Sequence, residues 1–220
     1  SLGLAFTGIQ AVSPKIFNHM PESSVFSSID VYKNLAPSGC IRALKADSLY
    51  WRDMGTPDDY RQTSREWLSG KRFNLPPAAF NAIEIEALAG DGSDRAWFRA
   101  THGKNTLVIS DHGICLDMPE TSDARAQIRA FVNIGRHLET QQLAAPKILD
   151  HDEISGQVVL EDLGSTHLAD RAAQTGENGT LSLYKKVIDA LIDFSQKGFQ
   201  GFDPAWTCQT RSYSKQMILD

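Results

Sequence analysis

The chain lacks the features that would place it outside a cell, in a membrane or on a nucleic acid. Its three cysteines, Cys40, Cys115 and Cys208, are far apart and odd in number, so they form neither a disulfide framework nor a zinc pattern. No apolar stretch approaches the roughly 20 residues that span a bilayer, and no secretion signal opens the sequence. The net charge of −5, without runs of Lys or Arg, gives no footprint for nucleic acid or a membrane surface. These absences predict a cytoplasmic protein with small-molecule partners.

The size and composition suit a globular protein. With 220 residues, of which 41% are hydrophobic, the chain is long enough for one large domain or two small ones. It begins at Ser1 inside an apolar run and stops at Leu219-Asp220. We therefore expect that both ends were cut from a longer protein.

Residues 1–70 predict an alternating α/β segment. Strand-like runs cover residues 2–9, 41–44 and 49–53. Helices are expected from Ser13-Pro14, over residues 29–36, and over residues 57–68 with a stop at Gly70. Residues 71–82 are broken by Asn74, Pro76 and Pro77, so they predict a linker.

Residues 83–220 have a different order of elements, typical of an α+β fold. Strand-like runs at 83–88, 96–101 and 106–110 are joined by short turns, which predicts an antiparallel meander. A helix over 124–140, two short strands at 147–149 and 158–161, and a long helix over 181–197 follow. The apolar stripes of both helices, around Ile128 and Val187, are expected to face a core.

The turn between the first two strands of this segment is rich in glycine and carries candidate phosphate donors. Glycines let backbone N–H groups approach an anion closely. A Walker loop and a dinucleotide fingerprint are excluded, because a strand follows the turn and the required lysine is absent. The remaining readings are a glycine-rich hairpin over nucleotide phosphates, as in the protein-kinase fold, and an ordinary β-turn. The residues concerned are Gly90, Asp91, Gly92, Ser93 and Arg95.

From about residue 83 the chain resembles the aminoglycoside phosphotransferase family, especially its branch of kinases that act on N-acetylated amino sugars. The motifs that carry the resemblance are Gly90-Asp91-Gly92-Ser93, Arg95, Trp97-Phe98-Arg99 and Leu160-Glu161-Asp162-Leu163-Gly164. The resemblance implies a kinase-like small lobe followed by the start of the large lobe. It also implies that Gly90, Asp91, Gly92 and Ser93 cover the phosphates of ATP, and that the backbones of Glu161 and Leu163 hold the adenine.

Two departures from that family pattern bear on function. The strand over 106–110 has no lysine to pair with the phosphates and Lys104 is a poor substitute, which leaves Arg95 or Arg99 to supply the charge. The catalytic loop is expected downstream of the helix that ends near Gly198, and His151-Asp152-Glu153 does not fit that role. We therefore expect no catalytic base in this chain and no turnover by it alone.

Residues 1–69 resemble the C-terminal third of sugar-1-phosphate nucleotidylyltransferases. Three motifs occur in the family's order: residues 4–10, Ser13-Pro14, and residues 50–57 with the sequence Tyr-Trp-Arg-Asp-Met-Gly-Thr-Pro. The resemblance implies that Asp53 is a ligand of Mg²⁺ and that Thr7 and Gly8 lie near the sugar. The alternative for Asp53 is an ordinary cap or surface residue, since Thr56, Pro57 and Asp59 form a helix start without it.

Together the two resemblances predict a fragment of a bifunctional enzyme. Residues 1–70 would be a nucleotidyltransferase fragment, 71–82 a linker, and 83–220 a kinase-like domain truncated before its catalytic loop. The kinase would make the sugar 1-phosphate that the transferase joins to a nucleoside triphosphate, with Mg²⁺ as cofactor. Two alternatives remain: a non-catalytic nucleotide-binding module with a sensing or scaffolding role, and an artificial joining of two fold fragments. The acidic residues Asp111, Asp117, Glu120 and Asp123 are expected in a solvated loop.

Overall fold

The computed structural model describes residues 6–23, 25–46, 49–90, 95–113, 115, 119 and 122–208. By its internal contacts the chain divides into two compact units, Ser1–Asp53 and Met54–Asp220. The strands found among the described residues belong to the second unit. Within the described part of the chain, no helix combines the length and the apolar character that crossing a membrane requires.

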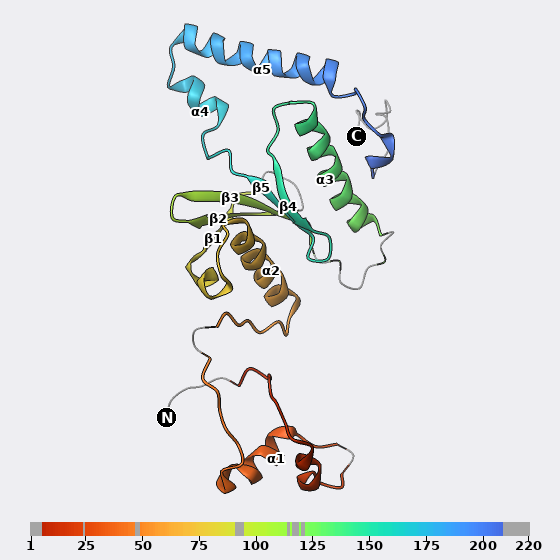
Figure 1. Ribbon diagram of the computed structural model, residues 1–220. Coiled ribbons are helices and arrows are strands. Elements are labelled where there is room, and N and C mark those ends of the chain that lie inside the picture. The colour runs from red at the N-terminus through yellow and green to blue at the C-terminus, as the bar shows by residue number, and fades with distance from the viewer. Residues whose placement is uncertain are drawn as a thin grey trace. The chain divides into compact units, whose positions relative to one another are not determined.

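The described residues of the first unit form three short helical elements, labelled in part in Figure 1: η1 (Pro14–His19), α1 (Ser28–Leu35) and η2 (Ala36–Ser38). The Ser13 side chain accepts a hydrogen bond from the Lys15 N–H at 3.4 Å, and Ser27 caps α1 in the same way through the Ile29 N–H. The predicted helix starts in this region are confirmed. Among the described residues of this unit, Val31 is the one that is buried.

The strands predicted in the first unit are wrong for the residues that the structure describes. The structure has no strand at residues 6–9, 41–44 or 49–53, while residues 2–5 lie outside the described part. A strand forms where a second backbone pairs with it and a neighbouring layer covers one of its faces. The apolar side chains of these runs remain in solvent, with Ile9 81% and Leu44 92% exposed. The α/β character predicted for residues 1–70 is therefore not seen in the described part of this unit.

The second unit contains a five-stranded antiparallel sheet in the order β1-β2-β3-β5-β4. The meander and the two later strands predicted from the sequence are confirmed. Their bounds are β1 (Glu84–Leu88), β2 (Ala96–His102), β3 (Asn105–Asp111), β4 (Ile148–Asp152) and β5 (Gln157–Glu161).

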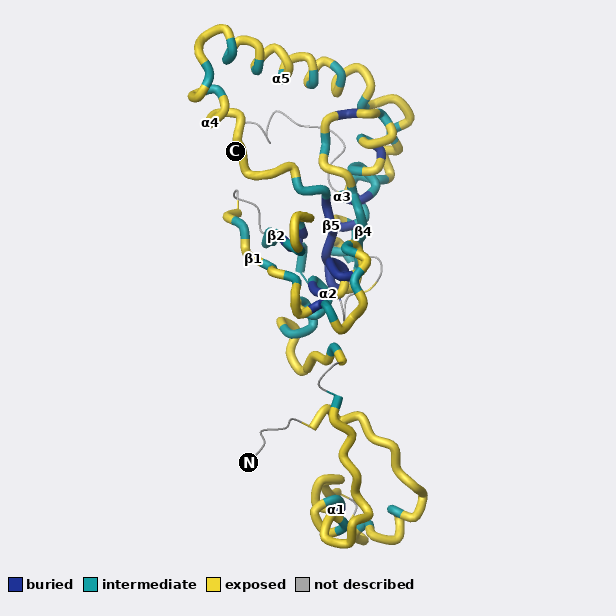
Figure 2. The backbone as a smooth tube through the Cα atoms, turned by 60° about the vertical axis from the view of Figure 1, so that its left-hand side comes forward, coloured by how far each residue is buried: buried dark blue, intermediate teal, exposed yellow. Residues whose placement is uncertain are grey.

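Two helices cover opposite faces of this sheet, as Figure 1 shows: α2 (Pro57–Arg72) and α3 (Asp123–Thr140). Neighbouring residues of a strand point to opposite faces, so the central strands are buried on both sides (Figure 2). On the α2 face Leu68 packs with Ala100, Leu107, Ile109 and Val159. On the α3 face the buried residues are Cys115, Ile128, Val132, Val158 and Leu160, which confirms that the Ile128 stripe faces a core.

Helix α2 begins where the capping box was predicted but continues past the predicted stop at Gly70. Thr56 Oγ1 accepts a hydrogen bond from the Asp59 N–H at 3.2 Å. Gly70 lies inside the helix, and a Cβ atom added there would be 2.1 Å from Cε1 of Phe80 in η3 (Pro77–Ala82). The glycine thus permits close packing of η3 on α2. Because α2 and η3 join the second unit, the structural division precedes the predicted linker at 71–82, whose role as a boundary between sequence families stays a prediction.

Beyond the sheet the chain forms α4 (Leu168–Ala173), α5 (Glu177–Lys197) and η4 (Pro204–Trp206). The long helix predicted at 181–197 is confirmed and begins four residues earlier. Its Val187 stripe was predicted to face a core, but no residue of α5 is buried (Figure 2). The segment after α5 contacts α3, because His137 Nε2 lies 2.8 Å from the Gly198 carbonyl oxygen and the His137 ring lies 5.4 Å from the Trp206 ring, tilted by 54°.

Candidate functional site

Residues 161–164 follow β5 directly, and we call them the hinge. The Asp162 carboxylate lies inside this turn with 5% of its side chain exposed. It accepts hydrogen bonds from Arg99 Nε at 2.7 Å, from Arg99 Nη2 at 3.1 Å and from the Gly164 N–H at 2.8 Å. The bond from Arg99 is the main cause that lowers the pKa of Asp162 below its ordinary value. The carboxylate therefore stays ionised and ties the hinge to β2.

The two hinge residues predicted to hold adenine differ in exposure. Glu161 is the last residue of β5, where its N–H donates to the Lys147 carbonyl oxygen at 3.0 Å. Leu163 lies beyond the strand, and the residue is 69% exposed. Backbone groups of an irregular segment at the end of an interior strand suit a planar heterocycle, which needs a small number of well-placed donors and acceptors. The adenine role of Glu161 and Leu163 stays a prediction.

The glycine-rich turn is described only in part. Gly90 is exposed, and a Cβ atom added there would meet no atom within 4 Å. Asp91, Gly92 and Ser93 lie outside the described residues, so their predicted contact with phosphates stays a prediction. Arg95 follows the turn, and its guanidinium carbon lies 5.2 Å from the centroid of the Phe131 ring on α3.

Arg95 belongs to a cluster that the sequence interpretation did not identify. His112, directly after β3, places its Nε2 3.1 Å from Ser110 Oγ and its ring edge-to-face with Phe131 at 5.2 Å. Burial and the positive charge of Arg95 lower the pKa of His112 to about 4, against an opposing effect of Asp111. The imidazole is therefore neutral near pH 7. Arg95 is the cation of this cluster and lies at the exit of the glycine-rich turn.

A second cluster, on the α2 side, corrects the prediction that Asp111 lies in a solvated loop. The Asp111 side chain is fully buried. Its oxygens accept hydrogen bonds from Arg61 Nε and Nη2 at 3.2 and 3.0 Å, from Arg65 Nη1 at 2.9 Å, from Gln157 Nε2 at 3.2 Å and from the Gly113 N–H at 3.0 Å. Every second residue of β3 points toward α2, so the pattern that buries Leu107 and Ile109 also buries Asp111. This alternation in the sequence could have predicted the burial of Asp111.

The other acidic residues of that predicted loop are described only in part. Asp123 is exposed at the start of α3, whereas Asp117 and Glu120 lie outside the described residues.

The predicted sugar-side and metal-binding residues of the first unit, Thr7, Gly8 and Asp53, are exposed to solvent. Thr7 accepts a long hydrogen bond of 3.5 Å from the Ile9 N–H, and Gly8 has the left-handed φ of +79° with open space around its Cα. Asp53 is exposed. Among the described residues, no group of three or more His, Cys, Asp or Glu side chains is arranged to hold a metal. One exposed carboxylate does not complete an octahedral Mg²⁺ site, so the described residues do not provide that site by themselves.

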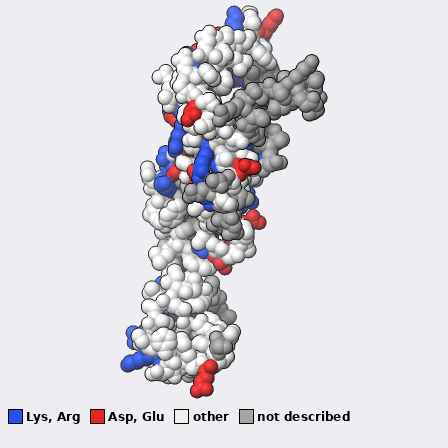
Figure 3. Space-filling view, turned by 90° about the vertical axis from the view of Figure 1, so that its right-hand side faces the viewer, with Lys and Arg blue, Asp and Glu red and all other residues white. Residues whose placement is uncertain are grey.

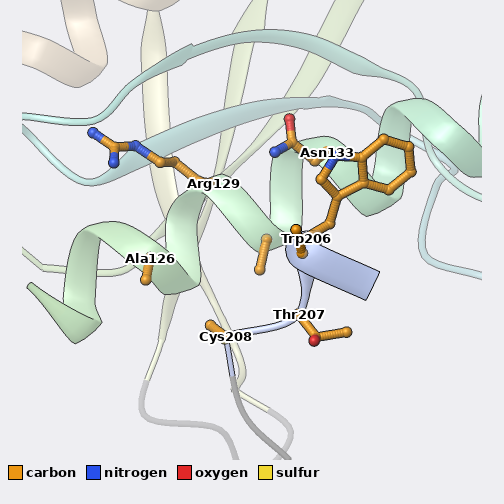
Figure 4. A pocket seen from close by; sticks show the side chains of 8 residues that line it. Ala126, Arg129, Asn133, Trp206, Thr207 and Cys208 are labelled. Atoms are coloured by element: carbon orange, nitrogen blue, oxygen red, sulfur yellow. The ribbon is translucent and has the colours of Figure 1, made fainter. Parts of the chain in front are cut away.

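Two shallow cavities lie along the side of α3 that faces η4, at about 250 and 430 Å³. Figure 4 shows Trp206 of η4 beside Asn133 of α3, while the Arg129 side chain points away from the indole. Neither cavity includes a predicted site residue. Figure 3 shows acidic and basic side chains side by side on the face drawn, as the near-balanced composition leads one to expect.

Comparison with curated proteins relates the chain to an amino-sugar kinase. It is 32% identical over 149 residues to the N-acetylmuramate/N-acetylglucosamine kinase of Caulobacter vibrioides. The match covers 59% of this chain and 40% of that protein, so the chain spans about two fifths of the length of the relative. A match of that extent does not fit within residues 1–70, so it includes residues of the segment with kinase-like motifs. No protein-family model matches the chain, and no solved structure matches it.

Proposed function

We propose that the chain from about residue 83 is the nucleotide-binding part of an ATP-dependent kinase for N-acetylated amino sugars. The observation that carries the proposal is the fold of this segment together with the similarity of the chain to an amino-sugar kinase. A five-stranded antiparallel sheet with α3 on one face, in the order predicted for a kinase small lobe, occurs in a chain related to an amino-sugar kinase. Adenine would bind at the backbone of Glu161 and Leu163. Residues 90–93 would cover the phosphates.

The cluster beside the glycine-rich turn suggests how the missing strand lysine is replaced. β3 has Ser110 on the face that it shares with α3, and Lys104 lies in the exposed β2–β3 turn. Arg99 is already held by Asp162 through two hydrogen bonds, so it is not available to the phosphates. Arg95 has no such carboxylate bond among the described residues, and its neighbour His112 is neutral. We therefore assign the phosphate-side charge to Arg95.

For residues 1–70 we propose the end of a sugar-1-phosphate nucleotidylyltransferase, on the support of the sequence motifs. Asp53 would be one carboxylate ligand of Mg²⁺ in that enzyme, and Thr7 and Gly8 would lie beside the sugar. The two activities are chemically consecutive, because phosphorylation at the anomeric carbon makes the sugar 1-phosphate that a nucleotidylyltransferase consumes. Both substrates occur in the cytoplasm, where we place the protein.

The test uses the protein expressed from the full open reading frame that contains this chain. With an N-acetylated amino sugar, ATP and Mg²⁺ we expect ADP and a sugar 1-phosphate, detected by phosphorus NMR. Addition of a second nucleoside triphosphate is expected to release pyrophosphate and form a nucleotide sugar. Absence of sugar-dependent ADP formation would contradict the kinase proposal, and absence of pyrophosphate release would contradict the transferase proposal.

Replacement of Arg95 tests the assignment of the phosphate-side charge. Because a hydrogen bond to a charged group contributes about 1.5–3 kcal/mol, we expect Arg95→Ala to raise the KM for ATP by about ten-fold or more. Arg136→Ala is the matched control, since Arg136 is an exposed arginine on α3. An unchanged KM for ATP in the Arg95 variant would contradict the assignment of the phosphate-side charge to Arg95.

A non-catalytic nucleotide-binding module is the second candidate. The observation that favours it is the absence of lysine from β3, since that residue normally pairs with the phosphates in kinases. This alternative predicts ATP binding, measured by calorimetry, without sugar-dependent ADP formation by the full-length protein. Turnover would exclude it.

A further inference from the structure

An ion pair joins two of the sequence motifs, through Arg99 and Asp162, which are 63 residues apart in the chain. Arg99 is the last residue of the Trp97-Phe98-Arg99 motif on β2, and Asp162 lies in the middle of the hinge. The guanidinium uses its Nε and Nη2 on the two carboxylate oxygens, at 2.7 and 3.1 Å. Such a two-point bond fixes orientation as well as distance, because the planar guanidinium and the planar carboxylate align.

The same carboxylate also shapes the hinge itself. Asp162 Oδ1 accepts the Gly164 N–H at 2.8 Å, which closes a turn around Leu163. Gly164 has a φ of +86°, a conformation that side-chain-bearing residues rarely adopt. Thr106 of β3 adds a further hydrogen bond that favours the ionised carboxylate. The path of the hinge is thus set by one buried carboxylate that β2 and β3 hold from the sheet side.

The pair is well shielded from solvent. The side chains of Arg99 and Asp162 are 19% and 5% exposed, and a second carboxylate, Glu86 of β1, lies 3.8 Å from Arg99 Nη1. Ion pairs on an open surface contribute little, whereas breaking a buried pair leaves an uncompensated charge. Loss of Arg99 would therefore let the Asp162 carboxylate turn toward water and release the Gly164 N–H.

We propose that Arg99 and Asp162 are positioning residues that hold the hinge backbone in the conformation that binds the nucleotide, without touching the nucleotide themselves. This inference rests on the proposed kinase function. It predicts that their replacement weakens the binding of ATP and leaves the sugar site and the chemical step largely unchanged. A purely structural pair would instead lower the amount of folded enzyme and thereby the apparent kcat, with the KM for ATP unchanged.

The test compares three variants of the full-length protein. Arg99→Lys keeps the charge but removes the two-point geometry, and Asp162→Asn keeps the shape but removes the charge. Because each substitution removes hydrogen bonds between charged groups, each variant is expected to raise the KM for ATP by about ten-fold or more. The KM for the sugar should change by less than about two-fold. The double variant is expected to match the worse single variant, since both changes break the same pair.

Glu153→Gln is the matched control. Glu153 pairs with Arg129 at 2.9 Å and joins the turn between β4 and β5 to α3, so it is an arginine–carboxylate pair of the same unit that lies outside the hinge. We expect its KM for ATP to equal that of the unchanged protein. Hydrogen exchange provides an assay that needs no nucleotide: the Gly164 amide is expected to exchange about ten-fold faster or more in both hinge variants and not in the control.

The outcomes separate the inference from the proposed function. If the unchanged protein turns over ATP while both hinge variants keep its KM and the exchange rate of Gly164, the positioning role is wrong and the kinase function stands. If the unchanged protein neither binds ATP nor forms ADP, both are wrong. Should Arg99→Lys fail to fold, the isosteric Asp162→Asn variant decides by the same measurements.

Discussion

His112 is a histidine whose surroundings oppose its protonation. Burial removes water from the imidazole, and the Arg95 guanidinium adds a repelling positive charge, so the pKa of His112 falls to about 4. The half-buried ring also lies within hydrogen-bond distance of Ser110 and edge-to-face with Phe131, contacts that suit a neutral imidazole. Because His112 lies between the end of β3 and α3, its protonation would disturb the cluster that places Arg95.

The stability of the second unit is therefore expected to depend on pH through His112. Its pKa is 6.5 when unfolded and about 4 when folded, so between these values the unfolded chain binds more protons than the folded one. The contribution of neutral His112 to the free energy of unfolding is complete above pH 6.5 and is lost as the pH falls toward 4. Below pH 4 this contribution no longer changes with pH. Thermal melts from pH 4 to 8 should show this slope in the unchanged protein and a weaker slope in His112→Gln. Equal slopes in both would contradict the assignment.

Residue pairings across the sheet were the least predictable part of the candidate site. The sequence pattern located the hinge and the glycine-rich turn, because both are local runs beside strands. It left Arg95 and Arg99 as equal candidates for the phosphate-side charge. Only the register of β2 against β3, and of β3 against β5, shows that Arg99 reaches Asp162, and long-range register is not contained in local propensity.

At the scale of elements, a buried charge network attaches α2 to the sheet. Arg61 and Arg65 are one helical turn apart on α2 and both bind Asp111 at the end of β3. Arg65 also lies over the Phe98 ring, with 4.2 Å between its guanidinium carbon and the ring centroid. Leu68 continues the same helix face into the apolar core. The helix is thus held by polar contacts near its start and by apolar contacts near its end.

Removal of the Asp111 charge is expected to destabilise this attachment strongly. Asp111→Asn removes the buried charge that the partly buried Arg61 and Arg65 share, and breaking a buried pair costs up to about 3–5 kcal/mol. The free energy of unfolding, measured in urea, should fall by that order. Asp123→Asn is the control, because Asp123 is exposed in the first turn of α3, and it should change stability by less than about 1 kcal/mol. A small effect of Asp111→Asn would show that α2 is held by its apolar face alone.

Element types were predicted well where local pattern and tertiary partners agree. In the five strands of the second unit, apolar residues alternate with polar ones or form short buried runs, and each strand pairs with a neighbour in the sheet. The runs at 41–44 and 49–53 have the same local character, yet the described residues offer them no pairing strand. Gly70 shows the reverse case, since a glycine predicted to stop α2 instead admits the Phe80 ring. Propensity identifies a candidate element, and its partners decide whether it forms.

At the scale of the whole molecule, both units carry large apolar side chains in solvent. On α5 they follow the helical period, at Tyr184, Ile188 and Leu191. In the first unit Ile9, Leu44 and other apolar residues are similarly uncovered. Single exposed apolar residues are ordinary, but a helix-long row is typical of a surface that another element or chain covers.

The isolated chain of residues 1–220 is therefore expected to self-associate through α5. Sedimentation velocity should show a mean mass that rises with concentration, because burying apolar area drives association. Ile188→Lys places a charge in the middle of the apolar row and should shift the distribution toward monomer. Ser182→Lys adds the same charge at an exposed position on the polar side of the same helix, and it should leave the association unchanged. A monomer at all concentrations, or equal effects of the two lysines, would show that the α5 row does not mediate association.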